Sequence, residues 1–350
     1  MITTVLTSFA LVASLVGSPS ASAPVFQSDV PEIPKITAER WITYDASSDV
    51  VLASWNANDR APMASVTKVM TAIIALENSE LGDIITVPSF ATGARGSNAG
   101  LVAGEKWSVG DLLMAVIVRS GNDAALTLAY HIGGESVAGF VAMMNARAAD
   151  LGMANTHFAN PNGLDAEAHY SSARDLLTLI IASQKYPDIR RVARTRLVSM
   201  PEDPNGKSRL FTNTNKLLGS YPGVTGLKTG DTPQADKVLL ATSERADRLI
   251  YTVVMGSDDH FADTRELLDW SYSTYSIRDR WLRPLFSEDG GGGATAASEI
   301  EVSANEERRL RALPALNDGR WNTSSLEDLP KAESIGRWIR EAIPNVVSGD

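Results

Sequence analysis

Ser65 and Lys68 lie three positions apart at the start of an apolar run that extends from Val66 to Leu76. If this run forms a helix, both side chains lie on one face. A serine hydroxyl becomes a good nucleophile only when a nearby base takes its proton, and a lysine can be that base if burial or positive charge lowers its pKa. The structural alternative is that Ser65 caps the helix after the turn signal Pro62. A lone Ser-x-x-Lys favours the cap, so a catalytic role needs support from elsewhere in the chain.

Two further short motifs supply that support. Ser120-Gly121-Asn122 lies at a break between two apolar helical segments, and Lys228-Thr229-Gly230 lies in a β-rich segment. Each motif is weak alone, since Ser54-Trp55-Asn56 also fits Ser-x-Asn. Their order and structural context match the signature of active-site serine penicillin-binding proteins and β-lactamases. The three motifs together therefore favour a nucleophile and base over a cap.

The resemblance extends beyond these motifs to the low-molecular-mass D-alanyl-D-alanine carboxypeptidases and covers residues 38–275. The stretches that carry it are 64–71, 120–125, 144–145, 151–153, 160–165, 169–176 and 226–230. It implies a β-lactamase/transpeptidase-like fold and acyl transfer, in which the terminal D-alanine of a peptidoglycan stem peptide is removed through an acyl-enzyme. It also implies that penicillins, which mimic acyl-D-Ala-D-Ala, acylate the same serine.

The resemblance assigns catalytic roles to four residues. Ser65 attacks the carbonyl carbon of the penultimate D-alanine, and Lys68 takes its proton. Burial and the charge of Lys228 are expected to lower the pKa of Lys68. Ser120 is expected to relay a proton to the leaving amine, and Asn122 to hold Lys68 and the substrate amide.

The third motif is expected to bind substrate. Lys228 and Thr229 face the terminal carboxylate, and Gly230 lets the substrate backbone lie close to the strand. By analogy with the family, the backbone N–H groups of Ser65 and Asp231 form an oxyanion hole.

Three positions depart from the family's pattern. Asp231 follows the Lys-Thr-Gly motif, where its carboxylate is expected to repel the substrate carboxylate unless Lys228 neutralises both. Ala235-Asp236 stands where Ala-Gly is expected. His260, before Phe261, stands where the family often has an arginine that grips the carboxylate, so it is either a carboxylate ligand or a solvated loop residue. These changes bear on substrate affinity more than on the nucleophile.

The elements that must position these motifs follow from hydrophobic patterning. Residues 41–44 and 50–55 read as an antiparallel hairpin, and residues 108–183 as mostly helical, with Ser108 and Asp111 in capping-box spacing. Residues 226–230, 237–242 and 249–255 read as strands, and 261–275 as a closing helix. We therefore predict an α/β fold whose antiparallel sheet is assembled from both ends of the chain, with a helical subdomain inserted.

Composition and segment boundaries complete the interpretation. The 350 residues carry a formal charge of -10 and no cysteine, which gives no electrostatic footprint for nucleic acid and no disulfide framework. Residues 1–23 resemble a signal peptide, although no Lys or Arg precedes Lys35, and they predict export to the periplasm, cell wall or exterior. We assign 24–37 to a linker, 38–286 to a catalytic domain and 287–350 to a Gly-rich linker and polar tail.

The tail and the remaining histidines favour structural roles. Ile335, Trp338, Ile339 and Ile343 form an apolar stripe at helical spacing, which is expected to pack on the protein, with a peripheral membrane contact as the alternative. His131, His157 and His169 lack metal-ligand spacing, so we expect neither a metal nor a cofactor.

Three other functions compete with the carboxypeptidase. Gly121 and the absence of a Glu-x-x-x-Asn loop between residues 150 and 185 argue against a class A β-lactamase. A D,D-endopeptidase of cross-links uses the same motifs and stays open. A non-catalytic wall-binding or scaffold protein is the third alternative, favoured only by Asp231 and Asp236.

Overall fold

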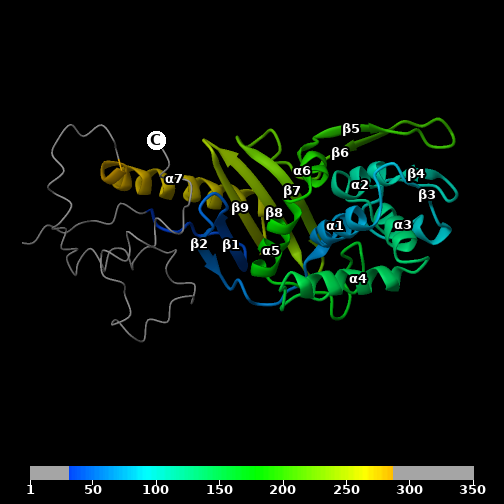
Figure 1. Ribbon diagram of the computed structural model, residues 1–350, viewed down its shortest axis with the longest axis horizontal. Helices are drawn as coiled ribbons and strands as arrows, with labels where there is room; N and C mark the ends of the chain where they lie inside the picture. Colours follow the sequence, from blue (N-terminus) through cyan, green and yellow to red (C-terminus); the bar gives the residue numbers. More distant parts are fainter. Residues whose placement is uncertain (1–30, 287–350) are drawn as a thin grey trace, which may run out of the picture.

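The computed structural model describes residues 31–286 (Figure 1). Its strands are β1 (Arg40–Asp45), β2 (Val50–Trp55), β3 (Ile84–Thr86), β4 (Lys106–Ser108), β5 (Leu197–Met200), β6 (Arg209–Thr212), β7 (Val224–Thr232), β8 (Asp236–Arg245) and β9 (Arg248–Ser257). Its helices are η1 (Ala64–Thr67), α1 (Lys68–Asn78), η2 (Ser89–Ala91), α2 (Val109–Ile117), α3 (Asn122–Ile132), α4 (Val137–Asp150), α5 (Ala173–Ser183), α6 (Pro187–Arg194) and α7 (His260–Phe286).

The main sheet has five strands in the order β2-β1-β9-β8-β7, and each neighbouring pair is antiparallel. The N-terminal strand β1 pairs with β9, so that Trp41 lies opposite Val254. The predicted sheet, assembled from both ends of the chain, is therefore confirmed. Strand β7 lies at the edge, so one row of its backbone N–H and C=O groups has no partner within the sheet.

The sheet is buried on both faces because its central strands carry consecutive apolar residues, whose side chains point to the two faces in turn. In β8, Leu239 and Ala241 belong to a cluster that includes Leu267 and Leu268 of α7. Val238 and Leu240 belong to the larger core, which includes α1 and α5. Figure 1 shows α7 along one side of the sheet and the helices α1 to α4 gathered beyond its other side.

Three helices begin at a serine cap, of which the one at Ser108 is predicted from the sequence. The hydroxyl of Ser108 accepts a hydrogen bond from the backbone N–H of Asp111, and Ser136 and Ser172 cap α4 and α5 in the same way. Helix α4 ends before Gly152, whose φ of 73° lies in the left-handed region that favours glycine. The predicted helical subdomain between the two halves of the sheet is confirmed.

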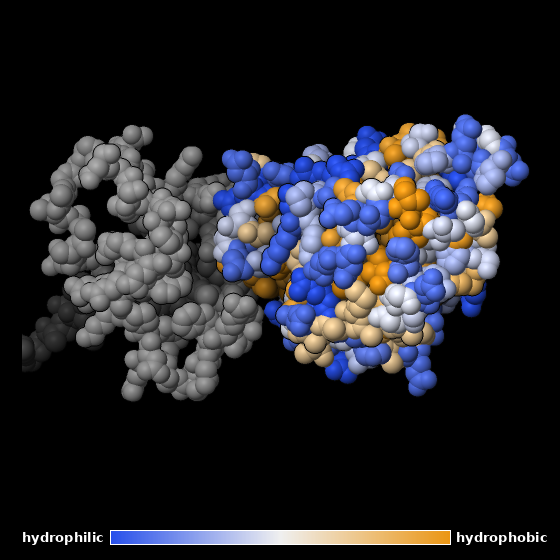
Figure 2. Space-filling view, turned by 45° about the vertical axis from the view of Figure 1, so that its right-hand side comes forward, coloured by the Kyte–Doolittle hydropathy of each residue, from blue (hydrophilic) through white to orange (hydrophobic). Residues whose placement is uncertain are grey.

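The sequence interpretation omitted several short elements. Helix α6 begins at Pro187, shortly after the end of α5, and a proline suits the first turn of a helix. The hairpins β3/β4 and β5/β6 were not predicted. Their residues Ile84, Leu197 and Leu210 are apolar and exposed. Figure 2 shows hydrophobic patches among hydrophilic ones on the face that it draws.

Two predictions concern segments outside the described residues: the signal peptide at 1–23 and the apolar stripe from Ile335 to Ile343. Between residues 31 and 286, no helix has the length and hydropathy needed to cross a bilayer.

Candidate active site

The Ser65–Lys68 pair lies where the single turn η1 joins α1. The ammonium group of Lys68 donates to Ser65 Oγ at 2.8 Å and to the carbonyl oxygen of Asn162 at 2.5 Å. Ser65 is half-buried and Lys68 is fully buried. Neither η1 nor α1 has a side-chain cap, so the capping alternative for Ser65 is wrong.

Burial also determines the chemistry of Lys68. Desolvation of the ammonium group lowers the pKa of Lys68 well below its usual value, and the positive charge of Lys228 lowers it further. The carboxylate of Asp123 acts in the opposite direction, because a nearby negative charge favours the ammonium form. The lowered pKa of Lys68 favours the neutral amine that a general base requires.

The other two motifs meet through Lys228. Its ammonium group donates to Ser120 Oγ at 3.0 Å and to the carbonyl oxygen of Thr229 at 2.9 Å. Burial lowers the pKa of Lys228 to about 7. Ser120 has a positive φ of 62°, a conformation that is uncommon outside glycine and is typical of functional sites. The structure thus places the hydroxyl of Ser120 in contact with a second buried lysine.

Asn122 has a different neighbourhood from the one expected. Its side-chain N–H donates to the carbonyl oxygen of Arg95 at 2.5 Å. Its buried Oδ1 has no hydrogen-bond partner among residues 31–286. The expected hydrogen bond to Lys68 is therefore not made, and Lys68 donates to Ser65 and Asn162. An unpaired buried acceptor is costly, so Asn122 is available to a donor from a ligand.

Gly230 brings the edge strand close to the nucleophile. A Cβ atom on Gly230 would lie 2.8 Å from the Cβ of Ala64 and 3.1 Å from the backbone nitrogen of Ser65. The absence of a side chain on Gly230 therefore lets η1 pack against β7. From the sequence alone, this space is assigned to the substrate backbone. This packing brings the backbone N–H of Ser65 close to strand β7, which continues into Asp231.

Asp231 does not neutralise Lys228. The Asp231 side chain is exposed, and the hydrogen bonds of Lys228 go to Ser120 and Thr229. The next departure, Asp236, is also exposed and adopts a positive φ of 50° at the first residue of β8.

His260 is not a solvated loop residue, because it begins α7 and is only 8% exposed. Burial lowers the pKa of His260 to about 4, while the charges of Asp259 and Asp231 act to raise it. The imidazole is therefore neutral at pH 7 and cannot supply the positive charge of an arginine. Its Nδ1 is buried without a hydrogen-bond partner in the described part of the chain.

Several site residues were not singled out from the sequence. The carbonyl of Asn162 accepts from Lys68, and the hydroxyl of Thr214 accepts from Thr229 at 2.7 Å. Asp165 accepts from the hydroxyl of Thr232 at 2.6 Å, which ties its loop to the end of β7. The buried Asp123 accepts from backbone N–H groups of the loop at 99–101. Asn162, Asp165 and Asp123 lie in stretches that carry the resemblance, which is the signal that marks them.

Among residues 31–286, no group of three or more His, Cys, Asp or Glu side chains has an arrangement suited to a metal ion. The groups gathered at the site are two hydroxyls, two buried lysines and one amide. This set suits a nucleophile, a base and a proton relay acting on a carbonyl carbon.

Comparisons with known proteins agree with this geometry. A family model described as D-alanyl-D-alanine carboxypeptidase matches residues 27–259. The D-alanyl-D-alanine carboxypeptidase DacF of Bacillus subtilis is 34% identical over 254 residues, which are 70% of this chain and 65% of that protein. The D-alanyl-D-alanine carboxypeptidase DacB2 of Mycobacterium tuberculosis is 34% identical over 249 residues, which are 69% of this chain and 84% of that protein.

Solved structures show the same similarity. The crystal structure of D-alanyl-D-alanine carboxypeptidase from Mycobacterium tuberculosis H37Rv has a TM-score of 0.66 at 33% identity and covers 70% of this chain and 95% of its own. The Streptomyces K15 DD-transpeptidase has a TM-score of 0.65 at 29% identity and covers 69% of this chain and 98% of its own.

Proposed function

Because the chain belongs to the D-alanyl-D-alanine carboxypeptidase family, we propose that it is a serine-type hydrolase that releases the terminal D-alanine of peptidoglycan stem peptides. The observation that carries the proposal is the 2.8 Å hydrogen bond between the fully buried Lys68 ammonium and Ser65 Oγ. A buried lysine whose pKa is lowered and whose nitrogen contacts a serine hydroxyl is suited to activate that hydroxyl. The proposed catalytic domain is residues 38–286.

Acylation begins when the neutral amine of Lys68 takes the proton of Ser65. The Oγ–C bond to the penultimate D-alanine forms, and the backbone N–H groups of Ser65 and Asp231 stabilise the oxyanion, at about 3 kcal/mol per donor. The C–N bond then breaks, and the amine of D-alanine leaves with a proton delivered through Ser120. Water afterwards attacks the ester, with Lys68 again taking a proton, and restores Ser65.

Substrate binding is assigned to the edge strand. The ammonium of Lys228 and the hydroxyl of Thr229 receive the terminal carboxylate, and the free backbone groups of β7 pair with the extended peptide. The unpaired Oδ1 of Asn122 accepts the N–H of the substrate amide. His260 contributes a hydrogen-bond donor rather than a charge, since burial lowers the pKa of His260 to about 4.

The test is covalent labelling of the purified protein by a fluorescent penicillin, which should acylate Ser65. We expect labelling of the wild type, none of Ser65→Ala, and full labelling of Ser89→Ala, a matched change at an exposed serine of η2. Wild-type protein should also release D-alanine from a stem pentapeptide. Absence of labelling at saturating penicillin would overturn the proposal and support a non-catalytic scaffold.

The substrate fixes the compartment in which such an enzyme can act. Peptidoglycan stem peptides of the wall lie outside the cytoplasmic membrane, so we propose that residues 1–23 direct export. Cell fractionation should find the full chain in the envelope or medium, and a chain that lacks residues 2–23 in the cytoplasm. Retention of both forms in the cytoplasm would contradict export.

A further inference from the structure

A chain of hydrogen bonds runs from His169 to the peptide bond that precedes the nucleophile. The backbone N–H of Ala159 donates to Nδ1 of His169 at 3.0 Å, so this nitrogen carries no proton. In a neutral imidazole the proton then lies on Nε2, which contacts Oγ1 of Thr67 at 2.9 Å. Oγ1 of Thr67 therefore accepts from His169, and it donates its own proton to the carbonyl oxygen of Ala64 at 2.8 Å. The direction of each hydrogen bond in this chain is thus determined.

Burial keeps the chain of hydrogen bonds intact at neutral pH. His169 is 4% exposed and Thr67 is fully buried. Burial lowers the pKa of His169 to about 4; the charges of His157 and Lys68 act in the same direction, and that of Asp165 acts in the opposite one. A protonated imidazole would place a second donor against the backbone N–H that faces Nδ1, so the chain requires the neutral form that is present at pH 7.

The end of the chain fixes the orientation of a peptide unit in the active site. The carbonyl of Ala64 and the N–H of Ser65 belong to one planar trans peptide, in which the two groups point in opposite directions. Ala64 has a φ of 50°, a conformation that an alanine keeps only when its surroundings hold it. The hydrogen bond from Thr67 is such a restraint. By holding the carbonyl, Thr67 also directs the N–H of Ser65, which we assign to the oxyanion hole.

Two glycines pack against the same peptide unit. A Cβ atom on Gly163 would lie 2.1 Å from the carbonyl oxygen of Ala64, and one on Gly230 would lie 3.1 Å from the backbone nitrogen of Ser65. Glycine has no side chain that could direct the carbonyl by a hydrogen bond. Among the side chains of residues 31–286, that hydrogen bond comes from Thr67.

We infer that His169 and Thr67 are positioning residues for acylation. His169 orients the hydroxyl of Thr67, and this hydroxyl holds the peptide between Ala64 and Ser65 so that the N–H of Ser65 meets the oxyanion. The inference rests on the proposed function. Because the oxyanion forms only as Ser65 Oγ adds to the carbonyl carbon, loss of the chain should slow acylation more than it weakens the binding that precedes it.

The experiment follows acylation of the full-length protein by a fluorescent penicillin over a range of concentrations. The maximal rate constant of acylation and the half-saturating concentration are thereby separated, and neither depends on the fraction of protein that is folded. We expect Thr67→Val, which removes the hydroxyl and keeps the branched shape, to lower the maximal rate constant at least about tenfold, since removal of a whole oxyanion-hole donor costs about 10²–10³-fold. The half-saturating concentration should change less than about twofold. Thr67→Ser keeps the hydroxyl and should restore most of the rate.

Substitutions of His169 test the other end of the chain. His169→Leu removes the donor to Thr67 and should slow acylation by a factor similar to that of Thr67→Val. His169→Gln offers an amide N–H near the position of Nε2 and should restore part of the rate. The double variant with Thr67→Val and His169→Leu should be no slower than Thr67→Val, because both changes break the same chain.

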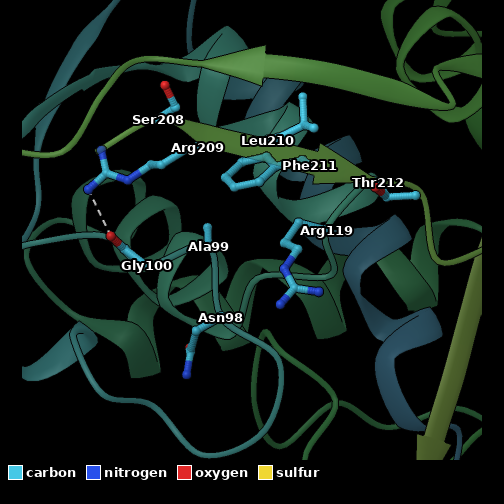
Figure 3. A pocket seen from close by; sticks show the side chains of 9 residues that line it. All are labelled: Asn98, Ala99, Gly100, Arg119, Ser208, Arg209, Leu210, Phe211 and Thr212. Carbon is cyan, nitrogen blue, oxygen red and sulfur yellow. Dashed lines mark hydrogen bonds between the residues drawn. The ribbon is translucent and has the colours of Figure 1, made fainter. Parts of the chain in front are cut away.

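Two threonines elsewhere in the chain provide matched controls. Thr127 is fully buried in α3, and its hydroxyl donates to the backbone carbonyl of Asp123 at 2.8 Å. Thr212 is exposed on β6, where Figure 3 shows it at the edge of a hollow of about 440 Å³. Neither contacts the peptide between Ala64 and Ser65, so Thr127→Val and Thr212→Val should keep the maximal rate constant within about twofold of the wild type.

Four outcomes would overturn the inference: an unchanged maximal rate constant in Thr67→Val, a Thr67→Ser variant as slow as Thr67→Val, a Thr127→Val variant as slow as Thr67→Val, or losses that multiply in the double variant. If Thr67→Val does not fold, equal rates in His169→Leu and the wild type would overturn it. In each case labelling of the wild type and its release of D-alanine from a stem pentapeptide still support the proposed hydrolase. If the wild type is neither labelled nor active, the proposed function fails and the inference fails with it.

Discussion

Replacement of Asp123 by asparagine tests whether one buried carboxylate holds the loop that lines the site. Asp123 is 1% exposed, and its Oδ1 accepts from the backbone N–H groups of Ala99 and Ala124, both at 2.9 Å. Its Oδ2 accepts from those of Gly100 at 2.9 Å and Leu101 at 3.0 Å. An asparagine keeps only one acceptor oxygen, so its amide group faces two backbone donors that it cannot satisfy. At about 1–2 kcal/mol for each lost charge-assisted bond, we expect a loss of about 3 kcal/mol.

Urea denaturation at pH 7 measures this loss as the change in the free energy of unfolding. The matched control is Asp188→Asn, which removes only an exposed ion pair with Arg191 and should cost less than about 0.5 kcal/mol. A second measurement separates loop disorder from electrostatics. The charge of Asp123 raises the pKa of Lys68, so its removal should move the pH dependence of penicillin acylation to lower pH. A loss below about 1 kcal/mol, or a shift to higher pH, would refute the reasoning.

Three further changes test individual parts of the site. In Lys228→Gln the pKa of Lys68 should rise, because a neighbouring positive charge is removed, and the rising limb of the acylation rate should move to higher pH; an unchanged limb would contradict the coupling. Burial lowers the pKa of His169 from 6.5 to about 4, so the stability that its neutral form contributes is full above about pH 6.5 and is lost as pH falls toward 4. Urea denaturation should show that the free energy of unfolding falls by at most ~3 kcal/mol over this pH range, and by less in His169→Gln. If the free energy of unfolding changes equally with pH in both proteins, His169 is not the cause. Gly230→Ala should slow penicillin acylation at least about tenfold, because the new Cβ collides with η1. Gly82→Ala, whose new Cβ has no atom within 4 Å, should not slow it. Equal rates in the wild type and both variants would refute the packing argument.

Local signals predicted much of the fold because they act over a few residues. Serine caps lie next to the backbone N–H groups that they bind. Apolar alternation reflects a strand buried on one face, and a short apolar run reflects a strand buried on both. The hairpins β3/β4 and β5/β6 were missed because they are short and place residues such as Leu197 and Leu210 at the surface. In β6, the buried position of Arg209 also breaks the apolar pattern. A charged residue is stable there because it pairs with Glu105, which is distant in the sequence.

The sequence by itself determined which groups are present: a serine and lysine at helical spacing, a second serine and asparagine at a break, and a second lysine in a strand. Only the tertiary structure decided their protonation and partners. Lys68 is a candidate base because the fold removes water from it and places Lys228 near it, from a segment far along the chain. Asn122 makes no hydrogen bond to Lys68, and His260 is buried. The physical reason is that pKa values and hydrogen-bond partners depend on solvent exclusion and on distances between remote segments, neither of which is encoded in local spacing.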